Sequence, residues 1–582
     1  MQRALEEREE LLQKVSARVA YSTPRRRRAG RVDDKATPAS FRSLPNKGQL
    51  FLLALCRLSE PLSNTCLLPY LYHLLESIQS PPPPSATEDG NSHNDGDAVS
   101  AAHISRLSGL LIAAFPLAQF ATSMLHGHLS DAHGRKPTVL LGLLVSCVAN
   151  LFFGFSRSIG ALVFWRVLAG LANGNVGVMR TMTAEIARER KFQTRAFLLL
   201  PLVFNTGMVA ALALGGCLAE PVVHMEWLFG PEGILNLAGN PEGVGWMVEY
   251  PYALPGVVNA AVLGGTLALA VLGLRETAPG KEGEDWGIKV RRIMGRAWRR
   301  LISSDQPVGY TEVQSDEPSD TPQEKDGFED DDVLSKHTKA PAPRHRISFR
   351  RIWTREVVAA ITSFGLLRLH NSAFMHTFAV FFSLPIAANK HPTAISFTGG
   401  LGLPSASVGL WLSLVGLAGI PLQLLAYPRI QARLGTLGVF RVALCLFPPV
   451  YAAAPYLALV RPAAGVARWM AIAAVLFVQV VARKFAIPST VVLLTDAAPA
   501  RSVLGTVHGA GNMVSSLARA IGPAVGGLVL SWGMERGVVG VVWWAYLTVM
   551  AVVALGWSYA MKGREEEWEG KERETGLDED RV

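Results

Sequence analysis

Charge is scarce over most of this chain of 582 residues. Lys, Arg, Asp and Glu make up 18% of it, against about 25% in a typical soluble domain. Of these 103 charged residues, 64 lie in three segments, 1–47, 275–356 and 562–582, and the other 432 residues contain only 39, or 9%. A water-soluble protein needs a polar, charged surface. A soluble enzyme or binding domain is therefore excluded, and we expect a membrane protein.

Cysteine is scarce as well, and the five cysteines lie in apolar segments without a C-x-x-C pair, which argues against a disulfide framework or a zinc knuckle. The motifs G-x-x-x-x-G-K-[ST], H-E-x-x-H and G-x-S-x-G are absent. The net charge of +9 lies in short clusters beside apolar runs, as membrane orientation signals do. We therefore expect no enzyme activity, no cofactor, no metal site and no nucleic-acid partner.

Long apolar runs are what the chain has in abundance. A membrane-spanning helix needs about 20 mostly apolar residues, and twelve runs approach that length. They cover residues 50–76, 105–126, 138–157, 160–184, 196–219, 252–274, 356–385, 407–427, 438–460, 469–495, 503–532 and 538–561. Lys and Arg are frequent in alternate loops such as 185–195, whereas 77–103 and 220–274 contain none. This bias predicts that both chain ends are cytoplasmic.

The long basic and acidic loop in the middle predicts two halves. We expect a six-helix bundle over 48–275, a largely disordered cytoplasmic linker over 276–350, and a second six-helix bundle over 351–561. The remaining 1–47 and 562–582 are expected to be charged cytoplasmic tails, the first of them basic and disordered. Residues 7–12 resemble an acidic dileucine sorting signal, although they also fit the start of an amphipathic helix. We expect a monomer in the lipid bilayer of the plasma membrane or the vacuole.

The loop after the second run carries the most specific motif, Gly127-His-Leu-Ser-Asp131-Ala-His-Gly134-Arg135-Lys136-Pro137. The glycines permit a tight reversal, and Asp131 can pair with basic groups or helix N-termini of the other half. This spacing resembles the loop signature G-x-L-a-D-x-x-G-R-K/R of the major facilitator superfamily. The resemblance implies a twelve-helix transporter in which this loop closes the cytoplasmic side. The alternative is a plain turn with orientation charges.

The first run contains Arg57, Glu60, Pro61 and Asn64. Arg57, Glu60 and Asn64 share one helix face, Glu60 lies about 15 Å deep, and Pro61 favours a kink. A buried carboxyl beside an arginine can gain or lose a proton as its surroundings change. We therefore predict Glu60 as the proton site with Arg57 as its partner. A permanent structural ion pair is the alternative.

The fourth run contains Arg166, Gly170 and Gly174 at spacings of four residues. Such glycines let helices approach closely, and an arginine inside a span needs a partner or water. The pattern resembles the fourth-helix motif of the superfamily, and the resemblance implies a part for Arg166 in proton coupling. We therefore predict Arg166, with Arg57, as a partner that tunes Glu60. The alternative is an arginine that reaches the outer interface.

Cations inside the later runs predict residues of a central cavity. Arg483 and Lys484 lie at mid-depth in the tenth run, where they are costly unless they face water or carboxylates. They can bind an anionic group or repel cations, unless the helix breaks there. We add His376, Arg519 and Asn64 as further residues of the cavity or substrate site.

The fifth and eleventh runs contain glycines predicted to serve helix packing and hinges. The block Gly522-Pro523-Ala-Val-Gly526-Gly527 closely resembles one that antiporters of the superfamily carry in the fifth helix. The fifth run itself has Gly207, Gly215 and Gly216, but Ala211-Leu212 where a Gly-Pro pair is usual. This departure weakens the antiporter assignment.

Longer stretches such as Gly174–Met182 and Ser516–Pro523 resemble fungal and plant members of the drug–proton antiporter branch, near the zinc-induced-facilitator-like proteins. The resemblance implies alternating access with proton-coupled export or exchange of a small organic molecule, drug or metal chelate. One alternative is a proton symporter for nutrient uptake. Another is a non-transporting membrane sensor that signals through the linker 276–350.

Overall fold

The structure of the protein is a computed structural model that describes residues 46–79, 93–187, 190–278, 349–386, 393, 395–460, 465–499 and 503–561. The expectations for both tails, for the sorting signal and for most of the linker lie outside these residues. Within the described residues all regular structure is helical, apart from one isolated bridge between Phe397 and Val538. The prediction of an all-helical protein is confirmed.

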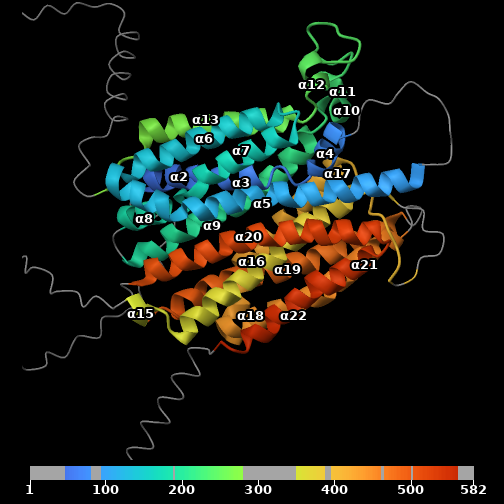
Figure 1. The fold of residues 1–582 in the computed structure, drawn as a ribbon. Helices are drawn as coiled ribbons and strands as arrows, with labels where there is room; N and C mark the ends of the chain where they lie inside the picture. The colour runs from blue at the N-terminus through green and yellow to red at the C-terminus, as the bar shows by residue number, and fades with distance from the viewer. Residues whose placement is uncertain are drawn as a thin grey trace, which may run out of the picture.

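A first set of helices covers residues 46–278 and is coloured blue to green in Figure 1. It consists of α2 (Lys47–Cys56), α3 (Ser59–Asn64), α4 (Leu71–Gln79), α5 (His93–His133), α6 (Arg135–Gly154), α7 (Ile159–Ala172), the 3-10 turn η2 (Asn173–Asn175), α8 (Val176–Ile186), α9 (Arg190–Leu218), the short α10 (Pro221–His224), α11 (Glu226–Phe229) and α12 (Gly245–Glu249), and α13 (Ala253–Gly273).

A second set covers residues 349–561 and is coloured yellow to red. It consists of α15 (Phe349–Ile352), α16 (Arg355–Ser383), α17 (Ser405–Pro421), the π-helical η4 (Leu422–Ala426), α18 (Tyr427–Ala453), the 3-10 segment η5 (Ala454–Leu459), α19 (Val466–Asp496), α20 (Leu504–Glu535), α21 (Val539–Val542), the π-helical η8 (Trp543–Thr548) and α22 (Val549–Ser558). The two sets lie side by side, with α5 and α20 next to each other (Figure 1).

Nine of the described helical segments are long and apolar enough to cross a membrane. One of them, Ser405–Leu459, covers both the eighth and the ninth apolar run, and Gly435 interrupts it with non-helical backbone angles. The seventh run forms α16, which is 29 residues long but is not among the nine, because Arg368, His370 and His376 make its middle polar. The first run is also not among them, since it is broken into α2, α3 and α4.

The first run is interrupted next to its proline. Helix α2 ends at Cys56 and α3 begins at Ser59, so Arg57 and Leu58 lie between them. Pro61 has no N–H to donate to the carbonyl of Arg57, and its ring would clash with that carbonyl in a continuous helix. The interruption of the helical hydrogen bonds therefore lies at Arg57, three residues before Glu60.

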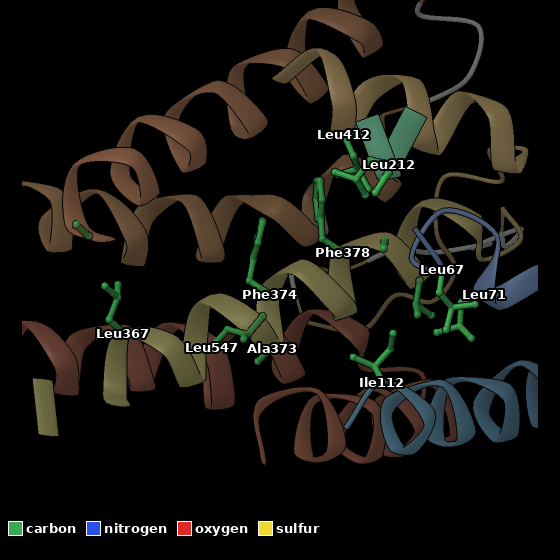
Figure 2. Packing of buried hydrophobic residues seen from close by; sticks show 14 of the residues in the cluster. Leu67, Leu71, Ile112, Leu212, Leu367, Ala373, Phe374, Phe378, Leu412 and Leu547 are labelled. Carbon is green, nitrogen blue, oxygen red and sulfur yellow. The ribbon is translucent and has the colours of Figure 1, made fainter. Parts of the chain in front are cut away.

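Aromatic side chains fill the core of the second set. Phe374 and Phe378 of α16 stack with ring centroids 4.9 Å apart, and both meet the fully buried Trp543 edge to face. Figure 2 shows the two phenylalanines on α16, near Ala373 and Leu547. Edge-to-face and offset pairs of this kind each contribute about 0.5–1.5 kcal/mol beyond their buried area. This packing holds α16 as a rigid support for the polar residues in its middle.

Two glycine crossings join the two sets. A Cβ on Gly109 of α5 would lie 2.5 Å from the Pro523 carbonyl oxygen and 3.0 Å from Cα of Gly527 in α20. Likewise, a Cβ on Gly216 of α9 would lie 2.7 Å from Cα of Gly409 in α17. Only glycine lets two helix backbones come this close. We refer to these contacts as the α5–α20 and α9–α17 glycine crossings.

The other glycines predicted for packing also lie against neighbouring elements. Gly170 and Gly174 of the fourth run face α5, Gly207 faces Leu58 and Pro61, and Gly215 faces the backbone of Cys66. In α20, Gly522 lies against Leu369 and Ser372 of α16, and Gly526 against Thr377.

Both glycine crossings lie near the same end of the helices. The crossing glycines Gly216 and Gly527 are close to the C-terminal ends of α9 and α20, next to α10–α12 and α21. We call the end with the glycine crossings the opposite end. Residues 46, 278, 349 and 561, where the two sets begin and end, lie at the other end of the helices, which we call the terminal end. Gln49 and Gly273 share a hydrogen bond there, as do Arg441 and Met561.

Candidate functional site

Glu60 is held between two arginines, one from each set of helices. The residue is only 2% exposed. One oxygen forms an ion pair with Arg57 Nη1 at 2.5 Å, and the other accepts a hydrogen bond from Arg519 Nη1 of α20, also at 2.5 Å. The predicted pair Arg57–Glu60 is present. Arg519, which was predicted only as a residue of the cavity, lies in direct contact with Glu60.

Arg519 continues this contact into a buried polar chain. Its Nη2 donates to Gln119 Oε1 of α5 at 2.7 Å, and the Gln119 amide donates to the Asn173 carbonyl at 3.0 Å. The Asn173 side chain accepts from the Ser59 hydroxyl at 2.8 Å and donates to Ser146 at 2.9 Å. Gln119, Ser59 and Ser146 were missed from the sequence, although an amide and two hydroxyls within apolar runs are the signal that points to them.

Arg166 lies apart from Glu60. It is 2% exposed and donates to the Ser63 carbonyl at 2.5 Å and to Asn64 Oδ1 at 2.8 Å, while its guanidinium lies over the ring of Phe115. Asn64 is therefore a partner of Arg166. The structure joins Arg57 to Glu60 but gives Arg166 other partners about one turn further along the first run.

The tenth run is continuous through its two cations, because α19 extends unbroken from Val466 to Asp496. Lys484 is 3% exposed and donates to Asn205 Oδ1 of α9 at 3.2 Å. Arg483 is 5% exposed, and its only hydrogen bond within the described residues is to the thioether sulfur of Met375, at 3.4 Å. Neither cation has a carboxylate partner there.

Two more arginines lie close to these groups. Arg180 of α8 and Arg368 of α16 are half-buried, and Arg368 lies within coulombic range of Arg519, Glu60, Arg483 and Arg180. Arg368 Nε is buried and has no hydrogen-bond partner. We call Arg57, Arg180, Arg368, Arg483, Lys484 and Arg519 the basic cluster. Within the described part of the chain, Glu60 is the only acid paired with it.

The predicted latch loop forms its contacts within the first set. Gly134 has φ of +108°, a conformation that favours glycine, between the end of α5 and the start of α6. Asp131 pairs with Arg135, which also reaches Glu185 at 3.4 Å. Glu276 caps α6 by accepting from the backbone N–H groups of Arg135 and Lys136 at 2.9 and 3.0 Å. The expected partner of Asp131 in the other half is replaced here by Arg135.

His376 is buried at a contact between the two sets. It is 1% exposed, and its Nε2 lies 2.9 Å from the hydroxyl of Ser108 in α5. Its side chain thus joins α16 to α5, near the α5–α20 glycine crossing. Within the described residues no group of three or more His, Cys, Asp or Glu side chains could hold a metal ion.

Comparisons with known proteins agree with this architecture. A model of the Major Facilitator Superfamily matches residues 53–447. The Major facilitator superfamily multidrug transporter mfsB of Aspergillus fumigatus is 30% identical over 553 residues, covering 91% of this chain and 84% of the relative. Protein ZINC INDUCED FACILITATOR 1 of Arabidopsis thaliana is 24% identical and covers 82% of this chain and 83% of its own length.

The fold is also similar to that of a solved structure. A bacterial homolog to the human lysosomal transporter Spinster, in an inward-facing and occupied conformation, has a TM-score of 0.54 and 13% identity, covering 88% of this chain and 95% of that one. The predicted resemblance is confirmed by the family match and by the fungal relative. The chain therefore belongs to the Major Facilitator Superfamily, as a multi-pass membrane transporter and not an enzyme.

Proposed function

We propose that this transporter couples the movement of a small organic molecule to protons, by alternating access, and that its working direction is export or exchange. The fold would consist of twelve spans in two six-helix bundles, with both chain ends cytoplasmic, in the plasma or vacuolar membrane. The printed name of the fungal relative, a multidrug transporter, supports export. The observation that carries proton coupling is the position of Glu60 between Arg57 and Arg519.

Glu60 links the two sets of helices through charge. While it is ionised, its ion pair with Arg519 holds α3 to α20. A proton on Glu60 removes the negative charge, and Arg519 then loses the charge-assisted part of this contact. Proton uptake would therefore loosen one connection between the two halves, which is the event that alternating access requires. Asn64 and Arg166 would hold the interrupted first run in the position that Glu60 needs.

The glycine crossings support a state that is closed at the opposite end, which is the external side in the proposed orientation. In the terminal half of the bundle, the loop of Gly127, Asp131 and Gly134 would close the cytoplasmic side in another state. Its present contacts with Glu185 and Glu276 would hold it ready in the first set.

Substitution of Glu60 by Gln tests the coupling. Purified protein is placed in liposomes that enclose a pH-sensitive dye, and ethidium and citrate are added as a cationic and an anionic probe. With Glu60→Gln we expect substrate counterflow to continue while the pH change disappears, because the amide has a similar shape but no titratable proton. Glu226→Gln, at an exposed carboxyl of α11, is the matched control. Proton flux that is equal in parent and Glu60→Gln would refute the proposed role.

A proton symporter is the second candidate, and two observations favour it. Ala211 and Leu212 replace the Gly-Pro pair expected of an antiporter, and both are fully buried in α9. The basic cluster also carries more positive charge than Glu60 can balance. The sign of the pH change separates the two candidates: entry of substrate acidifies the liposome lumen in symport and makes it alkaline in antiport.

A further inference from the structure

The basic cluster has an excess of positive charge at the contact between the two sets of helices. It contains six cations, and the described residues around it offer one carboxylate, Glu60. Arg57 and Arg519 already share that carboxylate. The remaining four cations are contributed by α8, α16 and α19, so the excess charge is spread over both sets.

The contacts of these four cations are weak substitutes for a counterion. Lys484 donates to the amide oxygen of Asn205, and Arg483 donates to the thioether sulfur of Met375, which is a weak acceptor. Arg368 lies over the ring of Phe364 and leaves its buried Nε without a partner. Arg180 has no ion pair to a described residue. A buried charge without a partner is costly, and in the middle of a membrane it is a strong indication of a functional site.

The cluster has the donors that a carboxylate or phosphate needs. A guanidinium presents planar, paired N–H groups that match two oxygens of such an anion, and an ammonium adds a compact charge. Arg57 and Arg519 retain 12% and 21% of their side-chain surface exposed, so the cluster is not sealed off. A ligand would therefore meet fixed donors from Arg368 on α16 and Arg483 on α19.

We propose that the transported substrate is an organic anion, whose carboxylate or phosphate oxygens are bound by Arg368, Arg483 and Lys484, with Arg180 facing them from the first set. This inference rests on the proposed transport function and specifies the chemical class of its substrate. Lys484 would release its contact with Asn205 to reach the anion. A cationic drug would meet repulsion at the same place, because the cluster is positive even when Glu60 is ionised.

Binding to the purified protein in nanodiscs tests the inference without a transport step. Citrate, inorganic phosphate and the neutral trimethyl ester of citrate are titrated by calorimetry at fixed ionic strength. We expect citrate or phosphate to bind and the ester not to bind, and the better of the two anions identifies carboxylate or phosphate as the preferred group. Equal binding of ester and citrate, or no binding of either anion, would overturn the inference.

Variants separate a binding role of Arg483 from a structural one. We expect Arg483→Gln to weaken anion binding at least tenfold, and Arg483→Lys to weaken it less. The ligand-free Arg483→Gln protein should melt no earlier than the parent, because the substitution removes an uncompensated buried charge. Arg157→Gln is the control, since Arg157 is 59% exposed and pairs with Glu249. A lower melting temperature of Arg483→Gln with unchanged anion affinity would assign Arg483 a structural role and refute the proposal.

These measurements fail independently of those on proton coupling. Anion binding that survives in a protein without proton flux would contradict the proposed function and leave the substrate class intact. Proton-coupled transport of ethidium, without any anion binding, would support the proposed function and contradict the substrate class.

Discussion

In the proposed state that is closed at the opposite end, the α9–α17 glycine crossing is sensitive to a single methyl group. In Gly216→Ala the new Cβ would lie 2.6 Å from the Ser405 carbonyl oxygen, and in Gly409→Ala 2.6 Å from that of Leu212. The helices must separate by several tenths of an ångström to relieve this contact. Overpacking of this kind costs about 1–3 kcal/mol. The gain in helix propensity from Gly to Ala arises in the open and closed states alike, so it does not offset the clash.

A cost of about 1–3 kcal/mol shifts the balance toward states open at the opposite end by about 5- to 150-fold. Spin labels at the exposed positions Glu226 and Arg536, one in each set, report the opening as a longer interlabel distance. The labels are introduced into a protein whose five native cysteines have been replaced by serine. In the double variant with Gly216→Ala and Gly409→Ala, the two added Cβ atoms would also contact each other. The increase in interlabel distance should therefore exceed the sum of the two single increases.

The control for this experiment is Gly265→Ala in α13, where no atom lies within 4 Å of the added Cβ. Expression and size-exclusion profiles show whether each variant is folded. Interlabel distances that are the same in Gly216→Ala, Gly409→Ala and Gly265→Ala would show that the crossing does not control the closed state, and the reasoning would fail.

Two further predictions concern positions with a defined local geometry. Gly134→Ala should lower the free energy of unfolding by about 1–2 kcal/mol because Gly134 has a positive φ. The loss is larger if Glu276 Oε2, 2.6 Å from the new Cβ, cannot move. A melting curve measures the change, and an unchanged midpoint would contradict the prediction. Asn173→Ala should cost about 1–3 kcal/mol, because it leaves the buried Ser59 without its acceptor; the same assay applies, and proton flux should fall with it if the polar chain positions Arg519.

The sequence predicts those features of the site that depend on neighbours along the chain. Arg57 and Glu60 are three residues apart in one run, so helix geometry alone brings them together. The break beside them follows from Pro61, and the tight turn of the loop follows from Gly134. The apolar runs predict the helices themselves, because their length and composition leave few other structures possible in lipid.

Contacts across the bundle depend on how the helices pack, and a single sequence does not contain that information in readable form. Glu60 and Arg519 are 459 residues apart, and only the packing of α20 against the first set of helices makes them neighbours. The same limit explains why Arg166 was assigned to Glu60 and not to Asn64: all three lie at similar depth, and one turn of difference decides the partner. Met375 beside Arg483 could not be inferred at all, since a thioether is not an expected partner of a cation.

The shared carboxylate of Glu60 relates the charge of the substrate to the direction of coupling. A proton on Glu60 makes its surroundings more positive, so an anion would bind best together with the proton. The two would then travel in the same direction, as in the symporter that is the second candidate. A cation would compete with the proton for the same negative charge and would travel against it. Because Glu60 lies between Arg57 and Arg519, the charge of the bound substrate would decide whether it moves with the proton or against it. Measuring substrate binding at two pH values can answer this.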